Sequence, residues 1–161
     1  MSYVPTQAGV RKRLFFPALL LLIFCAGHAS AQSTLFGTRA NQIGFGEALK
    51  IENGHMFAGA TQSVHSPGRV YVYESDGNGG WTEKTFLEAE DGEVQDRFGA
   101  AVDAEGEHLL VGAPSARAAY LIRDGEDSWV QQSRLTPSDS TEGFGKSVVL
   151  TDDHIYVGSS S

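Results

Sequence analysis

The sequence contains a single cysteine, Cys25, and this residue lies in the amino-terminal segment. Beyond residue 31 there is no thiol, which excludes disulfide bridges and cysteine-ligated zinc from that part of the chain. Basic side chains are also scarce, since 12 Lys and Arg stand against 20 Asp and Glu. A sustained helical period is missing after Ala31 as well, so the pattern does not favour helical bundles or helical solenoids.

The amino-terminal segment has the pattern of a secretory signal. A basic cluster at residues 11–13 precedes an apolar stretch of 14 residues at 14–27, and Ala29-Ser30-Ala31 follows. A basic cluster, an apolar stretch and a small-x-small cleavage site in this order are typical of a signal peptide. We predict a signal-peptide helix within residues 1–31, cleavage after Ala31, and a secreted, periplasmic or cell-surface product that meets the membrane only during export.

Two weaker alternatives concern the same segment. A retained membrane anchor needs about 20 apolar residues, which is more than this stretch offers. A lipid-modified Cys25 is disfavoured because Ile23 and Phe24 stand where lipoprotein signals carry small residues. Cleavage after Ala31 therefore remains the favoured interpretation.

Removal of the signal makes the remaining chain strongly acidic. It takes away three of the 12 basic side chains and none of the 20 acidic ones, which leaves nine against 20, a formal charge of −11 over 130 residues. Nucleic-acid binding requires clustered Lys and Arg to neutralise phosphates. We therefore expect no nucleic-acid partner.

The remaining chain, residues 32–161, repeats itself. Phe-Gly pairs occur at 45–46, 98–99 and 144–145, and in each case a glycine follows 14 residues after the Phe, at Gly59, Gly112 and Gly158. The steps between successive Phe residues are 53 and 46, and Trp81 and Trp129 keep the same register. A repeat of roughly 40–50 residues is typical of β-propeller blades.

Each complete repeat has the pattern of four short strands separated by turn-forming residues. In the second repeat these strands are expected at 98–102, 108–111, 118–122 and 129–135. Short, evenly spaced apolar runs between turn signals indicate an all-β fold. We predict β-propeller blades of four antiparallel strands at about 45–97 and 98–143 and a partial blade at 144–161. Since closed propellers take about four to eight blades, we expect these two and a half blades to be a fragment of a longer protein.

The repeated residues have a packing role in this interpretation. The ring of each repeat Phe fills the gap between neighbouring blades, and the glycines allow two backbones to approach where a side chain would collide. Gly77-Asn78-Gly79-Gly80 is expected to be a hairpin turn, because it lacks the Lys and Ser/Thr of a phosphate-binding loop.

These residues resemble the FG-GAP repeat, the blade of integrin α-chain propellers and of many secreted bacterial proteins. Phe98-Gly99 with Gly112-Ala113-Pro114 is the full signature, whereas the first repeat has Thr61 in place of the Pro and the third has Gly158-Ser159. The resemblance covers residues 36–161. It implies a seven-bladed propeller that binds other macromolecules.

The resemblance also implies calcium in many family members, held by an Asp-rich turn between the first two strands of a blade. Oxygen ligands at alternate positions suit this hard cation. The corresponding turns here are Glu52-Asn53-Gly54, residues 103–107 and Asp152-Asp153, which are short and lack that pattern. We expect no metal and no other cofactor.

Three histidines and one acidic cluster are the remaining candidates for chemistry. His55, His108 and His154 each stand ten residues after a repeat Phe, and we interpret them as polar residues that open the second strand, held apart by the rotation between blades. The acidic cluster is interpreted as a solvated connection between blades, and Arg69 and Arg117 as surface residues before the third strand. The cluster comprises Glu88, Glu90, Asp91, Glu93 and Asp96.

No catalytic pattern emerges from the sequence, which lacks a Gly-x-Ser-x-Gly elbow. We predict no catalytic, cofactor-binding or metal-binding residue, and a non-catalytic exported protein that binds a protein or glycan or has a structural role. The alternative is an accessory propeller domain of a secreted hydrolase whose catalytic residues lie beyond Ser161. A third hypothesis is a fragment without a stable fold.

Overall fold

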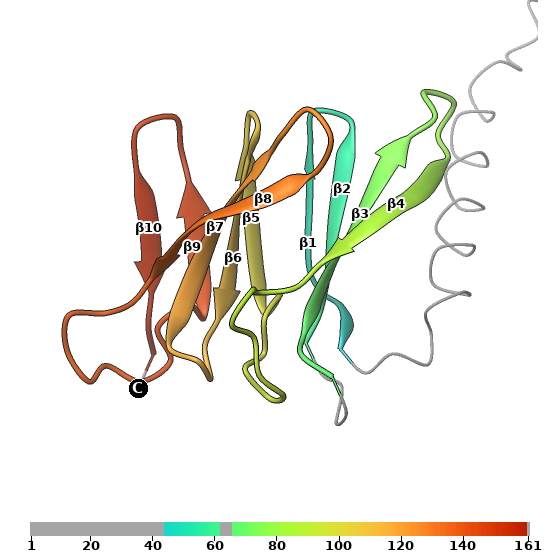
Figure 1. The fold of residues 1–161 in the computed structure, drawn as a ribbon. Coiled ribbons are helices and arrows are strands. Elements are labelled where there is room, and N and C mark those ends of the chain that lie inside the picture. The colour runs from blue at the N-terminus through green and yellow to red at the C-terminus, as the bar shows by residue number, and fades with distance from the viewer. Residues whose placement is uncertain (1–43, 62–65, 161) are drawn as a thin grey trace, which may run out of the picture.

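The computed structural model describes residues 44–61 and 66–160. These residues form ten β-strands in three antiparallel sheets that lie side by side in chain order, and no helix (Figure 1). The all-β prediction is confirmed for this part of the chain, whereas the predicted signal at residues 1–31 lies outside the described residues. Within 44–61 and 66–160, no helix is long and apolar enough to cross a bilayer.

Two of the sheets have four strands in the order of the chain, as the sequence predicts. The first sheet consists of β1 (Phe45–Glu52), β2 (His55–Ala60), β3 (Arg69–Ser75) and β4 (Trp81–Leu87). The second consists of β5 (Ala101–Glu105), β6 (His108–Ala113), β7 (Ala118–Asp124) and β8 (Trp129–Leu135). The third contains β9 (Ser147–Leu150) and β10 (Ile155–Gly158).

Tight turns join the strands within each sheet. In the first sheet Glu52 pairs with His55, so Asn53 and Gly54 form a two-residue loop, and both have positive φ, 45° and 76°. This is the loop whose twist matches that of an antiparallel hairpin. The predicted turn at Gly77-Asn78-Gly79-Gly80 is confirmed between β3 and β4, where the Asp76 carboxylate accepts the N–H groups of Asn78 and Gly80 at 2.8 Å.

Apolar side chains from facing sheets form the core. Between the first and second sheets, Phe57 and Val72 pack with the fully buried Phe98, Leu109 and Val111. Between the second and third sheets, a smaller cluster contains Leu110, Ala119, Val148 and Leu150. The ring of Phe98 lies 5.5 Å from that of Tyr120, edge to face. The repeat Phe thus fills the space between sheets, as expected.

The repeated glycines lie at these same junctions. A Cβ added at Gly59 would collide with the carbonyl oxygen of Gly99, and one added at Gly112 would collide with that of Gly145. Gly99 and Gly145 have φ values of 90° and 96°, a conformation that L residues with side chains rarely adopt. The glycine at the penultimate position of the second strand of one sheet therefore meets the Phe-Gly turn of the next sheet.

Two details of the sequence interpretation need correction. The sequence pattern predicts a strand from Phe98, but residues 98–100 form a turn and β5 begins at Ala101. The N–H groups of Gly99 and Ala100 both donate to the Gly112 carbonyl oxygen, at 3.0 and 3.2 Å, which is a turn and not a strand ladder. Arg69 and Arg117 are also not equivalent: Arg69 is the first residue of β3, whereas Arg117 precedes β7 and has a φ of 50°.

Candidate functional site

The connections from one sheet to the next are the longest loops between the described strands. Residues 88–100 join β4 to β5 and residues 136–146 join β8 to β9, and both loops lie at the same end of the sheets (Figure 1). The short β1–β2, β5–β6 and β9–β10 turns lie at the opposite end (Figure 1). The acidic cluster of the sequence falls in the first connection, so we define residues 88–97 as the acidic loop.

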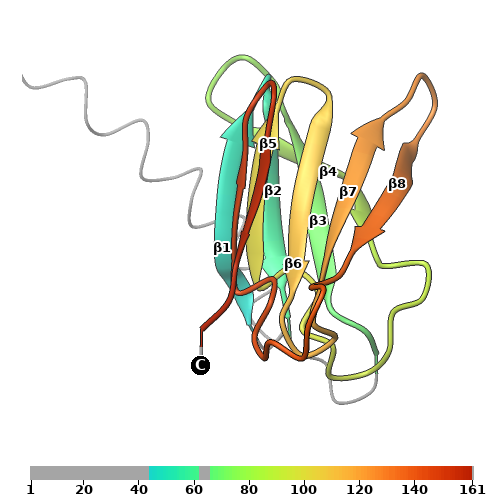
Figure 2. The same cartoon turned by 90° about the vertical axis from the view of Figure 1, so that its left-hand side faces the viewer.

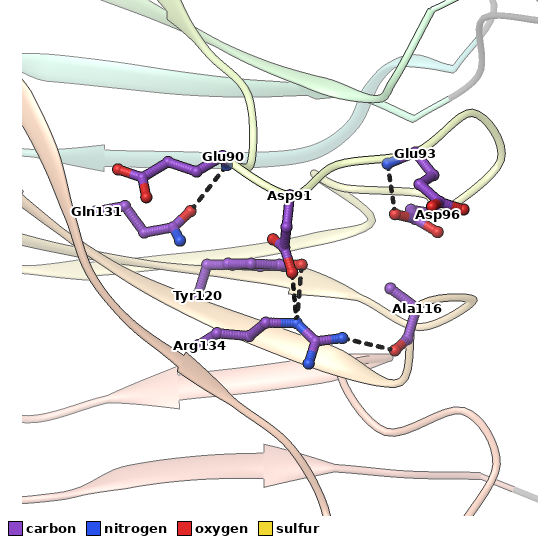
Figure 3. Close-up of polar contacts among 8 residues, drawn as sticks. All are labelled: Glu90, Asp91, Glu93, Asp96, Ala116, Tyr120, Gln131 and Arg134. Atoms are coloured by element: carbon purple, nitrogen blue, oxygen red, sulfur yellow. Dashed lines mark hydrogen bonds and ion pairs between the residues drawn. The ribbon is translucent and has the colours of Figure 1, made fainter.

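An arginine of the second sheet holds the acidic loop (Figure 3). The Arg134 Nε lies 3.0 Å from an Asp91 carboxylate oxygen, and the same nitrogen donates to the Tyr120 hydroxyl at 3.3 Å. Another guanidinium nitrogen donates to the Ala116 carbonyl oxygen at 3.4 Å. Arg134 therefore ties the loop before the second sheet to the outer strands of that sheet.

Strand pairing places this arginine. Tyr120 of β7 and Arg134 of β8 are directly opposed in the antiparallel register, so their side chains share one face of the sheet. Tyr120 is 1 % exposed. Burial raises the pKa of its phenol, the hydrogen bond from Arg134 acts against this rise, and Asp91 adds to it.

Further hydrogen bonds shape the rest of the acidic loop (Figure 3). The Glu90 N–H donates to the Gln131 side-chain oxygen of β8 at 3.2 Å. The Glu93 N–H donates to the Asp96 carboxylate at 2.7 Å and closes a local turn. The acidic loop is therefore ordered by its own carboxylates and by two side chains of β8, whereas the sequence interpretation describes only a solvated loop.

The two ends of the loop contact the first sheet. Glu88 accepts a hydrogen bond from Arg69 Nε at 2.6 Å, and the Arg69 guanidinium lies 4.3 Å from the ring centroid of Phe86. Arg97 forms an ion pair with Glu47 of β1 at 2.5 Å. Arg69 thus has two defined partners, whereas the sequence suggests only an exposed surface residue.

A second polar cluster links all three sheets at their first strands. One Asp103 carboxylate oxygen lies 2.8 Å from Lys50 Nζ of β1, and the other accepts the Leu150 N–H of β9 at 2.8 Å. Burial raises the pKa of Asp103, but the hydrogen bonds from Lys50 and Leu150 outweigh it and lower the pKa overall. The hydrogen bond between Lys50 and Asp103 also raises the pKa of Lys50.

The histidines stand where the sequence places them. His55 and His108 begin β2 and β6, and His154 directly precedes β10, so each belongs to a different sheet. The ring of His55 lies 5.8 Å from that of Trp129 in the second sheet, an edge-to-face contact. Within the described ranges, no group of three or more His, Cys, Asp and Glu side chains is arranged to hold a metal ion.

The β1–β2 and β5–β6 turns do not have the form of a calcium loop. Glu52 pairs with His55 and Glu105 with His108, so each of these loops contains only two residues. A calcium loop needs several oxygen ligands that converge on one point. A two-residue hairpin cannot supply them, and Asp103 is instead engaged by Lys50 and Leu150.

The acidic loop is therefore a surface loop whose shape is set by contacts with Arg134 and Gln131 and by its own Asp96. The sequence revealed the acidic residues but not Arg134 or Gln131. The available signal was the hairpin register that sets Arg134 opposite Tyr120.

One comparison with known proteins agrees with this geometry. The family model of the FG-GAP repeat matches residues 81–127, a segment that runs from β4 through the acidic loop to the end of β7. A comparison with curated proteins gives no match. The matched segment contains both Phe98-Gly99 and Gly112-Ala113-Pro114. This chain therefore carries an FG-GAP repeat at residues 81–127, which confirms the resemblance stated from the sequence.

Proposed function

We propose that the chain is the propeller-forming part of an exported, non-catalytic protein that binds a protein or glycan through the loop end of its blades. In this proposal each sheet is one blade, the described residues make two blades and part of a third, and calcium has no role in the β1–β2 and β5–β6 turns. The signal peptide at residues 1–31 directs export and is removed after Ala31.

The repeated geometry carries this proposal. The two junctions between sheets share the same elements: a glycine of the second strand meets the next Phe-Gly turn, and the Phe of that turn packs against the apolar cluster between the sheets, as the buried Phe98 and the partly buried Phe144 do. Such a joint can be repeated around an axis, which is how propellers are built. The FG-GAP match over residues 81–127 supports the same architecture.

The acidic loop is the best candidate for partner contact. Glu90 and Glu93 are exposed, and the backbone around them is held by Gln131 and Asp96. A preorganised loop loses less conformational entropy when it binds. Loops that a rigid sheet positions are also where binding residues are concentrated.

Export is tested by the mass of the product. The complete chain is expressed in a bacterium, and the protein in the culture medium or periplasm is analysed by mass spectrometry. The expected product begins at Gln32. Recovery of the uncleaved chain in the cytoplasm alone would contradict the export proposal.

Binding is tested with two matched double variants. The exported chain is applied to an array of glycans and to purified extracellular proteins, and its saturable binding is compared with that of Glu90→Lys/Glu93→Lys. The control, Asp152→Lys/Asp153→Lys, reverses the same number of exposed carboxylates in the β9–β10 turn, at the opposite end (Figure 1). We expect loss of binding in the first variant only. Equal binding by both variants would exclude the acidic loop.

A further inference from the structure

Two asparagines of the first sheet are followed by glycine, Asn53-Gly54 in the β1–β2 turn and Asn78-Gly79 in the β3–β4 loop. An asparagine in this position can lose its side-chain amide without an enzyme. The backbone nitrogen of the following residue attacks the side-chain carbonyl carbon, and glycine hinders this attack least because it has no side chain and the widest backbone freedom. The surroundings of each pair then decide how easily it reacts.

The Asn53 side chain is tied to the second sheet. Its Nδ2 donates to the Gly106 carbonyl oxygen at 3.1 Å. The turn is only two residues long, because Glu52 and His55 pair on either side of it. The attack requires the side chain to rotate toward the Gly54 nitrogen, and Nδ2 is the atom that leaves. Reaction at Asn53 must therefore break the contact with Gly106.

The Asn78 side chain is not tied in this way. Ser75 pairs with Trp81, which leaves a longer loop at residues 76–80. Within the part of the chain that the structure describes, neither the Asn78 side-chain amide nor the Gly79 N–H has a hydrogen-bond partner, and both residues are exposed. A Cβ added at Gly79 would meet no atom within 4 Å. The two reacting groups can therefore approach each other without the loss of a contact.

The rest of this loop is held by Asp76. Its carboxylate accepts the N–H groups of Asn78 and Gly80, and its own N–H donates to the Gly80 carbonyl oxygen at 3.0 Å. These bonds fix the backbone on both sides of Gly79 and leave the Gly79 nitrogen itself open. The loop is thus closed at its base and accessible at the reacting pair.

The Asp-Gly pairs of the described residues can form the same kind of ring, but their glycine nitrogens are engaged. The N–H donates to Ser75 Oγ at Gly77, to the Ala89 carbonyl oxygen at Gly92 and to the Ser128 carbonyl oxygen at Gly125, at 3.2, 3.0 and 3.0 Å. An ionised carboxylate is also a poorer target for a nucleophile than an amide. The Asn78-Gly79 pair therefore differs from each of the others in having both reacting groups free.

We propose that Asn78-Gly79 is a site of spontaneous deamidation and that Asn53-Gly54 is protected in the folded chain. The Gly79 nitrogen gives up its proton and forms a bond to Cγ of Asn78, the Cγ–Nδ2 bond breaks, and the amide nitrogen leaves as ammonia. Water then opens the cyclic imide at either carbonyl group, which yields aspartate or isoaspartate. Each product adds a negative charge, so the chain becomes more acidic as it ages.

The modification lies away from the proposed binding loop. Figures 1 and 2 show the β3–β4 loop at the same end of the sheets as the β1–β2 and β5–β6 turns, opposite to the acidic loop. A carboxylate at residue 78 would stand close to that of Asp76, which accepts the N–H of the same residue. Isoaspartate would also lengthen the backbone inside the turn that Asp76 and Gly80 close. We expect faster amide exchange at residues 76–80 after the reaction.

The test incubates the purified chain at mildly alkaline pH, which favours loss of the glycine N–H proton. Peptide mapping with mass spectrometry follows each asparagine in the folded chain and in the chain unfolded by denaturant. We expect Asn78 to react at similar rates in both states. Asn53 should react about tenfold more slowly when folded, the factor that one hydrogen bond supplies. Equal rates at the two asparagines in the folded chain, whether both fast or both slow, would overturn the proposal.

Two variants assign the product to its site. Asn78→Gln keeps an amide but lengthens the side chain, so that the attack would have to close a larger ring more slowly. Asn53→Gly is the matched control, because Gly106 stands at the equivalent position of the second repeat with a φ of 61°. Isoelectric focusing of aged samples should show a new acidic species in the original chain and in Asn53→Gly. Formation of this species at the same rate in Asn78→Gln, with the fold verified by circular dichroism, would refute the assignment.

Discussion

Gly112 of the second sheet lies against the carbonyl oxygen of Gly145 in the third, so no side chain can be accommodated at residue 112 without moving a backbone. Gly59 and Gly99 form the same contact one sheet earlier. The two junctions between sheets thus have the same geometry, and its contribution to the free energy of unfolding can be measured.

Substitution of Gly112 by Ala should destabilise the fold. The added methyl group meets the Gly145 backbone, and overpacking of this kind costs about 1–3 kcal/mol of unfolding free energy. Denaturant unfolding measures the loss. Gly106→Asn is the control, because Gly106 has open space and a φ of 61°, and its repeat equivalent is Asn53 with a φ of 45°. Equal stability of Gly112→Ala and the original chain would contradict the glycine contact.

Removal of the Phe98 ring should have a larger effect. The ring is fully buried between the first two sheets and contacts Tyr120. Truncation of a buried Phe to Ala costs about 3–5 kcal/mol. Val130→Ala, at a residue that is 52 % exposed, should change the unfolding free energy by less than about 0.5 kcal/mol. A similar loss in the two variants, measured by denaturant unfolding, would show that Phe98 is not part of the core.

The Asp103 contacts should make stability depend on acid. Because the folded-state pKa of Asp103 is lowered, its ionised form stabilises the fold above the unfolded pKa, about 3.9. This contribution is lost as the pH falls through the lower folded-state value. Asp103→Asn should therefore cost about 1 kcal/mol at neutral pH, with a smaller difference from the original chain near pH 2.

Thermal melts of both proteins at neutral and acidic pH measure this difference. Asp91→Asn is a useful comparison, because the Asp91 carboxylate pairs with Arg134 on the surface and its side chain is 52 % exposed. An unchanged gap between Asp103→Asn and the original chain at all pH values would show that the ionised carboxylate is not the source of the effect.

Arg134→Gln should release the acidic loop without unfolding the sheets. The variant loses the ion pair with Asp91 and the hydrogen bond to Tyr120. Because the Arg134 hydrogen bond lowers the pKa of Tyr120 against the effects of burial and Asp91, its removal should raise that pKa further. NMR titration of ring-labelled tyrosine measures the shift, and amide exchange of residues 88–97 measures the release. Unchanged amide exchange there would refute the role of Arg134 as a tie.

The sequence was sufficient for the fold because the repeat encodes both strands and junctions. Phe98, Gly99 and Gly112 recur at fixed spacing, and their roles in packing follow from ring size and from the absence of a side chain. The predicted start of β5 is wrong because the N–H groups of Gly99 and Ala100 both donate to the Gly112 carbonyl oxygen and form a turn. The apolar alternation alone does not contain that information.

The polar contacts were less predictable, because they depend on which sheets face each other. Asp91 and Arg134 are 43 residues apart, and nothing in their local sequences connects them. Asp103 resembles a turn carboxylate in the sequence, but the stacking of three sheets brings Lys50 and the Leu150 N–H to it.

The repeated glycine contact also bears on how such a chain can change length. Each junction requires only a glycine at one position of the second strand of one sheet and a Phe-Gly turn before the next sheet. Duplication or loss of one whole repeat leaves every remaining junction with the same two partners. An ancestor of this chain could therefore gain or lose sheets in single genetic steps, without compensating substitutions elsewhere.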